Sequence, residues 1–159
     1  LIISWFDTGK PIYIQKRVGL NLKTFKLIKF RTMKIGTKSK ATHLVNKSDI
    51  TAIGYFLRKF KIDEIPQLLN VLVGDMSIVG PRPVLPVQFE LLEMRQQAGV
   101  YVLRPGITGW AQINGRDDLG TSDKVRLDVE YLARRSLFFD LKIIWSTAIY
   151  VTRSRGVWH

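Results

Sequence analysis

Three prolines and one glycine interrupt the middle of the chain at residues 77–86, which read SIVGPRPVLP. Proline lacks a backbone donor, clashes with a preceding helical turn and restricts the residue before it, so no regular helix can run through this segment. A second loop rich in glycine and proline follows at residues 104–109. We therefore expect a rigid loop at residues 77–86 that presents Arg82 from between Pro81 and Pro83.

Apolar and polar residues alternate within residues 11–31, on both sides of Gly19, and this pattern is typical of a β-hairpin. We expect its turn near residues 19–23, with Lys29 and Arg31 at its exit. Residues 33–47 are polar, basic and without a period, which predicts a mobile loop.

Helices are expected in the rest of the chain, where apolar residues recur at helical spacing. Ser48 or Asp49 can cap a helix that runs to Phe60, and Asp63 can cap a second one. The apolar side of this second helix would be Ile65, Leu68, Leu69 and Leu72. Further helices are predicted over residues 87–98, from Thr121 or Ser122 through Leu132, and over residues 137–150.

The last of these helices has two interpretations. Its apolar stripe contains Phe138, Leu141, Trp145, Ala148 and Ile149 and is flanked by Lys142, Arg153 and Arg155. The stripe could pack into the core, or it could lie in a membrane interface, which the flanking cations, Tyr150 and Trp158 favour. No apolar run reaches the roughly 20 residues that a membrane span needs.

Composition limits the chemistry. The 159 residues, 46% hydrophobic and 24% charged, fit one domain over residues 1–159. The chain has no cysteine and only two histidines, His43 and the terminal His159, so thiol chemistry is excluded and a histidine-based site is not expected. The net charge is +12, and residues 10–47 contain eleven Lys or Arg but no acid. This excess favours phosphate-rich partners: nucleic acid, nucleotides or anionic lipid.

Asp63 and Glu64 form an acidic pair at an expected helix start, where the helix dipole favours an ionised aspartate. Such a carboxylate can be a nucleophile that forms an acyl phosphate, and its neighbour can hold Mg²⁺. The plainer alternative is ordinary helix capping. Cations able to reach phosphate oxygens occur at the ends of elements or in loops, and these are Lys29, Arg31, Arg58, Arg82, Arg104 and Arg116.

The motifs FRTM, DEIPQLLN, SIVGPRP and RPGITGWAQINGR, in this order, resemble those of the bacterial sugar transferases, also called monotopic phosphoglycosyl transferases. The resemblance covers nearly the whole chain. It implies an α+β fold that is mostly α-helical, with a small β-hairpin and amphipathic interfacial helices. It also implies a preceding hydrophobic helix, of which this chain has only the end, and a place at the cytoplasmic face of the bacterial plasma membrane.

The resemblance further implies a ping-pong reaction between a UDP-sugar and polyprenyl phosphate. Asp63 would attack the β-phosphorus and release UMP, and Glu64 with Asp63 would bind Mg²⁺ or Mn²⁺. Lys29, Arg31, Arg58, Arg82 and Arg116 would bind phosphate or uridine groups. Two alternatives stay open at this point: a basic nucleic-acid-binding domain, although aromatic residues are few in the basic stretch, and a membrane-bound scaffold without activity.

Overall fold

The computed structural model describes residues 9–37, 47–115 and 118–152. The fold is α+β and mostly helical, as expected. Its elements are β1 (Ile12–Val18), η1 (Leu20–Leu22), β2 (Thr24–Phe30), η3 (Lys47–Asp49), α2 (Ala52–Lys59), η4 (Ile62–Glu64), α3 (Gln67–Leu72), β3 (Ser77–Val79), α4 (Phe89–Gln97), η5 (Val100–Val102), β4 (Gly106–Thr108), α5 (Trp110–Ile113), α6 (Thr121–Arg134) and α7 (Leu137–Thr152).

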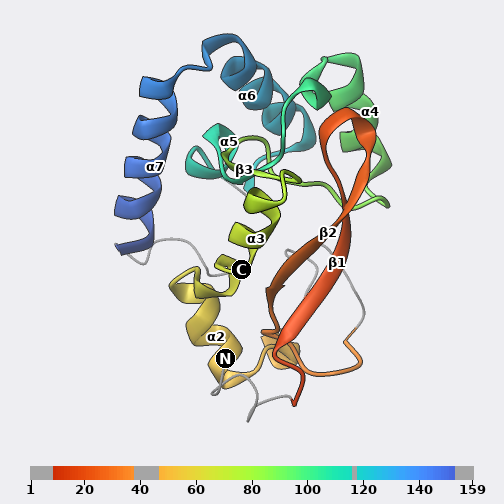
Figure 1. Ribbon diagram of the computed structural model, residues 1–159, viewed down its shortest axis with the longest axis vertical. Coiled ribbons are helices and arrows are strands. Elements are labelled where there is room, and N and C mark those ends of the chain that lie inside the picture. Colours follow the sequence, from red (N-terminus) through yellow and green to blue (C-terminus); the bar gives the residue numbers. More distant parts are fainter. Residues whose placement is uncertain (1–8, 38–46, 116–117, 153–159) are drawn as a thin grey trace.

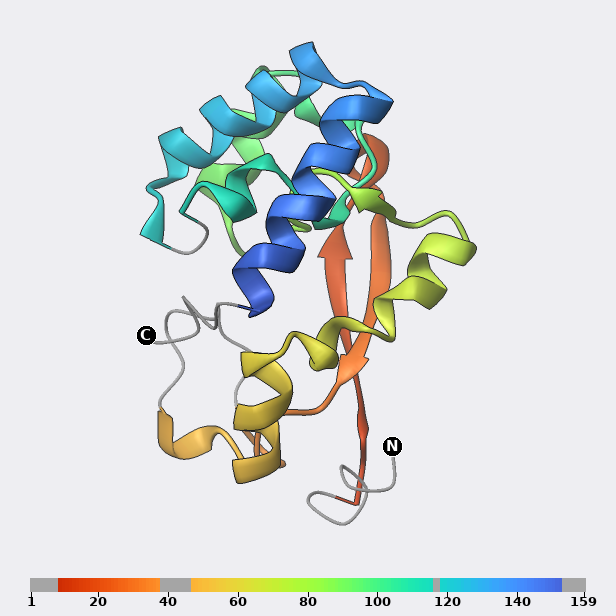
Figure 2. The same ribbon diagram turned by 90° about the vertical axis from the view of Figure 1, so that its left-hand side faces the viewer.

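The hairpin of β1 and β2 runs along one side of the molecule, from α4 near its turn to α2 near its open end (Figure 1). Helices α6 and α7 form the opposite side, and α3 lies between the two sides. The short strands β3 and β4 pair in parallel near the middle, with Ser77 beside Gly106 and Val79 beside Thr108. Turning the molecule by 90° shows α7 crossing in front of this central part (Figure 2).

The predicted hairpin is confirmed. Strands β1 and β2 pair antiparallel from Ile12 opposite Phe30 to Val18 opposite Thr24. The turn contains two residues with left-handed backbone, Asn21 and Leu22. Because side chains alternate along a strand, residues two apart share a face. Most of the loop expected at residues 33–47 lies outside the described residues.

Helix α2 begins later than expected. Ser48 and Asp49 lie in the short η3 turn, and the N-cap is Thr51, whose Oγ1 accepts a hydrogen bond from the Gly54 N–H at 2.9 Å. The close approach of the helix to Thr32 explains this start: a Cβ on Gly54 would lie 2.1 Å from the Thr32 carbonyl oxygen. Glycine thus lets α2 pack directly on the chain that leaves β2.

The interpretation of Asp63 as a helix cap is wrong. Asp63 lies inside η4 and is buried, whereas α3 begins at Gln67 with Pro66 at its N-cap. The apolar side of α3 faces outwards: Leu68, Leu69 and Leu72 are exposed, Leu72 to 82%.

Asn70 explains why α3 turns its polar side inwards. It is 1% exposed, its Oδ1 accepts from the Ile28 N–H at 3.0 Å, and its Nδ2 donates to the Lys26 carbonyl at 2.8 Å. These bonds satisfy main-chain groups of β2, a strand with one open edge. A buried backbone group without a partner costs about 1–3 kcal/mol, so this arrangement is preferred although it exposes leucines.

The core lies under α5, α6 and α7. Its centre is a cluster of five buried residues from four segments, Val79, Leu103, Tyr131, Phe139 and Ile143. Helices α4 and α6 occupy the ranges expected for them, although Gly120 and not a hydroxyl residue is the N-cap of α6.

Helix α7 has two apolar sides. Phe139 and Ile143 are buried in the core, while the predicted stripe of Phe138, Leu141 and Trp145 is exposed. The stripe is therefore not the core-facing side, which removes the first of its two interpretations. Arg153, Arg155 and Trp158 lie outside the described residues. Among the helices that the structure describes, none is both long and apolar enough to span a bilayer.

Candidate active site

Asp63 is held by an unusual reversal of the chain. Lys61, which connects α2 to η4, has left-handed backbone with φ 59°. A non-glycine residue in such a conformation costs about 1–3 kcal/mol, and such strain is found preferentially at functional sites. After this reversal Asp63 turns inwards and is 8% exposed. The side chain of its neighbour Glu64 lines a cavity.

Opposing effects set the protonation of Asp63. Burial raises the pKa of Asp63 from 3.8 to about 7, and the charge of Glu64 adds to the rise. The positive charges of Lys29, Arg58 and Arg82 act in the other direction. These three cations come from β2, α2 and the loop after β3, so the fold brings side chains from three distant segments to one carboxylate. Part of the Asp63 population is therefore ionised at neutral pH despite burial.

Lys29 and Arg17 are basic residues of the site whose pKa values are lowered by burial and by neighbouring positive charges. Burial and, second, the nearby charge of Arg17 lower the pKa of Lys29 to about 8. Burial and the charge of Arg82 lower the pKa of Arg17 to about 10. Arg17 is fixed by Gln15, which accepts from its Nη2 at 2.7 Å, and by the Pro83 carbonyl at 2.9 Å. Several desolvated cations held close together form a site for an anion with several oxygens, such as a diphosphate.

Arg82 lies in a loop, as expected, but this loop begins only at Gly80, because Ser77–Val79 of the expected loop form strand β3. The loop passes so close to the next segment that a Cβ on Gly80 would lie 2.4 Å from the Arg104 carbonyl oxygen. The carbonyl of Arg82 accepts from Arg95 Nη1 at 2.7 Å, and Arg95 forms a buried ion pair with Asp128 at 2.6 Å. The side chain of Arg82 reaches Glu64, with 3.4 Å between Nη1 and Oε1.

The other predicted cations are placed differently. Arg58 Nε donates to Thr32 Oγ1 at 2.9 Å, which holds this arginine beside the end of β2. Arg31 lies at the base of the hairpin, where its Nε donates to the Lys10 carbonyl. Arg104 donates to the Gly74 carbonyl at 2.9 Å and is not among the charges that act on Asp63. Arg116 lies outside the described residues.

Sequence reasoning missed Arg17 and Lys61 as parts of the site. Arg17 has a detectable signal, because the period of two along β1 places Tyr13, Gln15 and Arg17 on one face of the hairpin. Tyr13 pairs with Lys29 of β2, so Arg17 lies on the same face as this predicted site residue. Lys61, whose Nζ lies 3.8 Å from Glu64 Oε1, has no comparable signal. Its left-handed backbone is visible only in the structure.

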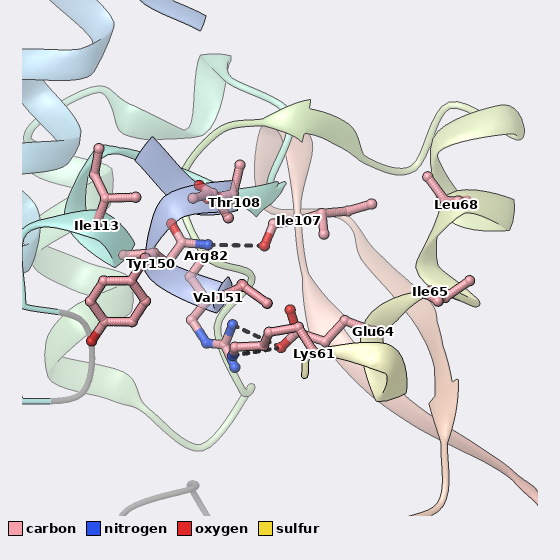
Figure 3. Close-up of a pocket in the computed structure, with 12 residues that line it drawn as sticks. Lys61, Glu64, Ile65, Leu68, Arg82, Ile107, Thr108, Ile113, Tyr150 and Val151 are labelled. Atoms are coloured by element: carbon pink, nitrogen blue, oxygen red, sulfur yellow. Dashed lines mark hydrogen bonds and ion pairs between the residues drawn. The ribbon is translucent and has the colours of Figure 1, made fainter. Parts of the chain in front are cut away.

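A cavity of about 210 Å³ opens beside this charged cluster (Figure 3). One wall comes from η4 and α3, another from the last turns of α7, and the remainder from the Arg82 loop, β4 and α5. Its charged end contains side chains already described, while most of its walls are apolar. The lining residues are Lys61, Glu64, Ile65, Leu68, Arg82, Ile107, Thr108, Gln112, Ile113, Thr147, Tyr150 and Val151.

Known proteins are similar to this chain over almost its whole length. Residues 1–154 match the family model described as bacterial sugar transferase. The chain belongs to this family. The Bacillus subtilis protein named "uncharacterized sugar transferase EpsL" is 47% identical over 94% of this chain and 74% of its own length. The exopolysaccharide production protein ExoY of Rhizobium meliloti is 39% identical over 98% of this chain and 76% of its own length.

A third relative in the bacterial sugar transferase family has a more specific name. The UDP-glucose:undecaprenyl-phosphate glucose-1-phosphate transferase of Escherichia coli is 42% identical over 92% of this chain and 34% of its own length. The family membership gives no support to the alternative of a nucleic-acid-binding domain. In the structure, Lys29 of the hairpin is one of the three cations that act on the buried Asp63 carboxylate.

Asp63 and Glu64 suit a divalent cation only in part. Within residues 9–37, 47–115 and 118–152, no cluster of three acidic, histidine or cysteine residues can hold a metal by itself. Mg²⁺, however, commonly binds one or two carboxylates and takes its other ligands from water and substrate phosphates. The pair therefore fits Mg²⁺ shared with a diphosphate, with Glu64 at the cavity and Asp63 behind it.

Proposed function

We propose that this bacterial sugar transferase moves a sugar-1-phosphate from a UDP-sugar to polyprenyl phosphate, giving a polyprenyl-diphosphate sugar and UMP. The observation that carries the proposal is the buried Asp63, which is ionisable near neutral pH and surrounded by Lys29, Arg58 and Arg82. The name of the Escherichia coli relative supports the same pair of substrates. Such products would serve the assembly of surface polysaccharides, and the ExoY name supports this role.

In the proposed first step, an Asp63 carboxylate oxygen attacks the β-phosphorus of the UDP-sugar. A bond forms from this oxygen to phosphorus, and the bond from the β-phosphorus to the bridging oxygen breaks, so that UMP leaves with the electron pair. In the second step a phosphate oxygen of polyprenyl phosphate attacks the acyl phosphate. The Asp63 carboxylate is thereby restored, and no proton or electron remains unaccounted for.

The surrounding cations would stabilise the charge that develops on the phosphate oxygens during both steps. Lys29 and Arg82 are held in place by the fold before substrate arrives, and preorganised charges of this kind supply the largest single contribution in many enzymes. Asp63 is the better nucleophile candidate of the acidic pair, because Glu64 faces the cavity and is paired with Arg82 and Lys61.

A test of the proposal is UMP release by the full-length protein in detergent. Undecaprenyl phosphate and a panel of UDP-sugars would be supplied, and the lipid product would be identified by mass spectrometry. We expect one UDP-sugar to give UMP and a polyprenyl-diphosphate sugar in equal amounts. The proposal fails if no UDP-sugar in the panel gives a lipid-linked product.

Mg²⁺ or Mn²⁺ is expected to be required. The ion would be held by Glu64 together with Asp63, and when bound it supplies positive charge to the diphosphate. Because loss of this charge costs several kcal/mol in the transition state, excess EDTA should lower turnover by roughly 100-fold or more, and added Mg²⁺ should restore it. The measurement is UMP release at fixed substrate concentrations. Undiminished turnover in EDTA would contradict the requirement.

The pH dependence of the first step should follow Asp63 and Lys29. The raised pKa of Asp63, about 7, means that the nucleophilic carboxylate increases as pH rises through 7. The lowered pKa of Lys29, about 8, means that its positive charge is lost as pH rises through 8. We expect kcat/KM for the UDP-sugar to be bell-shaped, with a maximum between these values. A flat profile from pH 5 to 9 would contradict this assignment.

The membrane association expected for this family is also a proposal. We place the exposed stripe of α7 against the cytoplasmic surface of the plasma membrane, with Lys142 near anionic headgroups. In a variant of this chain that keeps Trp145 as its single tryptophan, anionic vesicles should shift the fluorescence to the blue, less so at high salt. Neutral vesicles are the control. An unchanged spectrum with anionic vesicles would show that the stripe stays in water.

A further inference from the structure

We propose that the cavity between α3 and α7 binds the hydrocarbon of the acceptor lipid next to its phosphate, and that Arg82 and Lys61 at its charged end receive that phosphate. This inference rests on the proposed function, because it assigns one of the two substrates of that reaction to a place. It adds the residues that distinguish the acceptor from the sugar donor.

The shape of the cavity suits an apolar chain with a charged head. Figure 3 shows Ile65 and Leu68 on one side of the cavity, and Tyr150, Val151 and Ile113 toward the other. In Figure 3 the charged groups of Lys61, Glu64 and Arg82 gather together at one side of these apolar side chains. A prenyl phosphate has the same division, since hydrocarbon begins directly after its phosphate.

The two threonine hydroxyl groups in the wall are already hydrogen-bonded within the protein. The Thr108 and Thr147 hydroxyls lie 2.7 Å apart, and Thr147 donates to the Ile143 carbonyl at 2.8 Å. Thr108 therefore donates to Thr147. The Gln112 amide donates to the Ile107 carbonyl. Gln112 Oε1 is buried without a hydrogen-bond partner among the described residues. A sugar or a uracil needs several hydrogen-bond partners and this wall offers few, whereas hydrocarbon needs none.

The surroundings of the cavity continue its apolar character. Leu72 lies one turn beyond the lining residue Leu68 and is 82% exposed, and its neighbour Val73 is 72% exposed. A cavity of about 210 Å³ can enclose only the start of a long polyprenyl chain. The exposed Leu72 and Val73 at the end of α3 would contact the part of the chain that extends beyond the cavity.

The charged end of the cavity also lies next to the proposed nucleophile, Asp63. Glu64 lies between Arg82, at 3.4 Å, and Lys61, at 3.8 Å, and is the chain neighbour of Asp63. A phosphate bound by these two cations would stand next to the proposed acyl phosphate. Its oxygen would then be positioned to attack in the second step, after UMP has left.

The test separates the two half-reactions in the full-length enzyme. Val151→Trp should fill the cavity, and Val102→Trp, the same change at an exposed residue outside the cavity, is the control. For Val151→Trp we expect the UMP burst without lipid to stay within about twofold of wild type, while kcat/KM for undecaprenyl phosphate falls roughly 10-fold or more, as loss of an apolar contact predicts. Val102→Trp should change neither quantity.

A second variant guards against misfolding. Leu68→Gln places a polar group in the same wall at an exposed position, and it should also lower kcat/KM for the lipid while the burst persists. If both cavity variants lose the burst but remain folded by thermal unfolding, the cavity binds the UDP-sugar and the inference is wrong. If neither quantity changes, the lipid binds elsewhere. If wild type itself shows no burst without lipid, the proposed covalent mechanism fails independently.

Discussion

Asp63→Asn is expected to abolish the burst of UMP that a UDP-sugar gives in the absence of lipid acceptor. Wild-type enzyme should release about one equivalent of UMP per active site, because each Asp63 accepts one sugar phosphate. The neutral amide is a poor nucleophile, so the rate should fall by roughly 10³-fold or more, as with other removed nucleophiles. Rapid-quench measurement of UMP determines both the amplitude and the rate.

The adduct itself provides a second readout. An acyl phosphate is labile to hydroxylamine, so the sugar phosphate should be discharged by it, and its peptide should contain residues 61–70. Glu64→Gln should slow the burst without abolishing it, because metal binding is weakened while the nucleophile remains. Asp123→Asn, which changes an exposed aspartate on α6, is the control for the loss of one negative charge. A strictly sequential reaction, with no UMP before lipid is added and no adduct, would end the proposal for Asp63.

Arg95→Met is expected to destabilise the fold more than any surface change. The ion pair of Arg95 with Asp128 is almost fully buried, the side chains being 4% and 2% exposed. Removing one partner leaves the other charge buried without compensation, which costs about 3–5 kcal/mol in free energy of unfolding. Urea denaturation of wild type and variant measures this difference directly.

Matched variants separate the pair from general effects. Arg126→Met breaks an exposed ion pair with Asp123 on the same helix as Asp128 and should cost less than about 1 kcal/mol. The double variant Arg95→Met with Asp128→Leu should recover much of the stability, since no buried charge is left. It should not recover activity, because the Arg82 carbonyl loses the donor that fixes its loop. A cost below about 1 kcal/mol for Arg95→Met alone would show that removing Arg95 does not leave Asp128 as an uncompensated buried charge.

The family membership was accessible from the sequence because its motifs are short, contiguous and arranged in a particular order. The hairpin and the rigid loop around Arg82 were accessible for a local reason: alternation of side chains and the restrictions of proline act between near neighbours. Helices α4, α6 and α7 follow from the same kind of signal, since residues three and four apart share a side. The single domain over residues 1–159 stays a prediction.

The orientation of α3 depended on a partner far along the chain. Its leucines have the spacing of a buried side, and only the contact of Asn70 with the open edge of β2 shows that the polar side is the inner one. Likewise Thr51 became the cap of α2 because Gly54 packs against Thr32. Local pattern specifies which residues share a side, but not which side meets the protein.

The candidate site, too, was predictable from the sequence only in part. Asp63 and Glu64 could be selected from the sequence as chemically useful, but burial of Asp63, the left-handed Lys61 and the convergence of Lys29 and Arg82 arise only when separate elements pack together. The chain alone determined the residue types, the short elements and the family. Tertiary structure decided which charges act on one another and where the cavity opens, because electrostatic and hydrophobic free energies depend on distance and burial between segments remote in sequence.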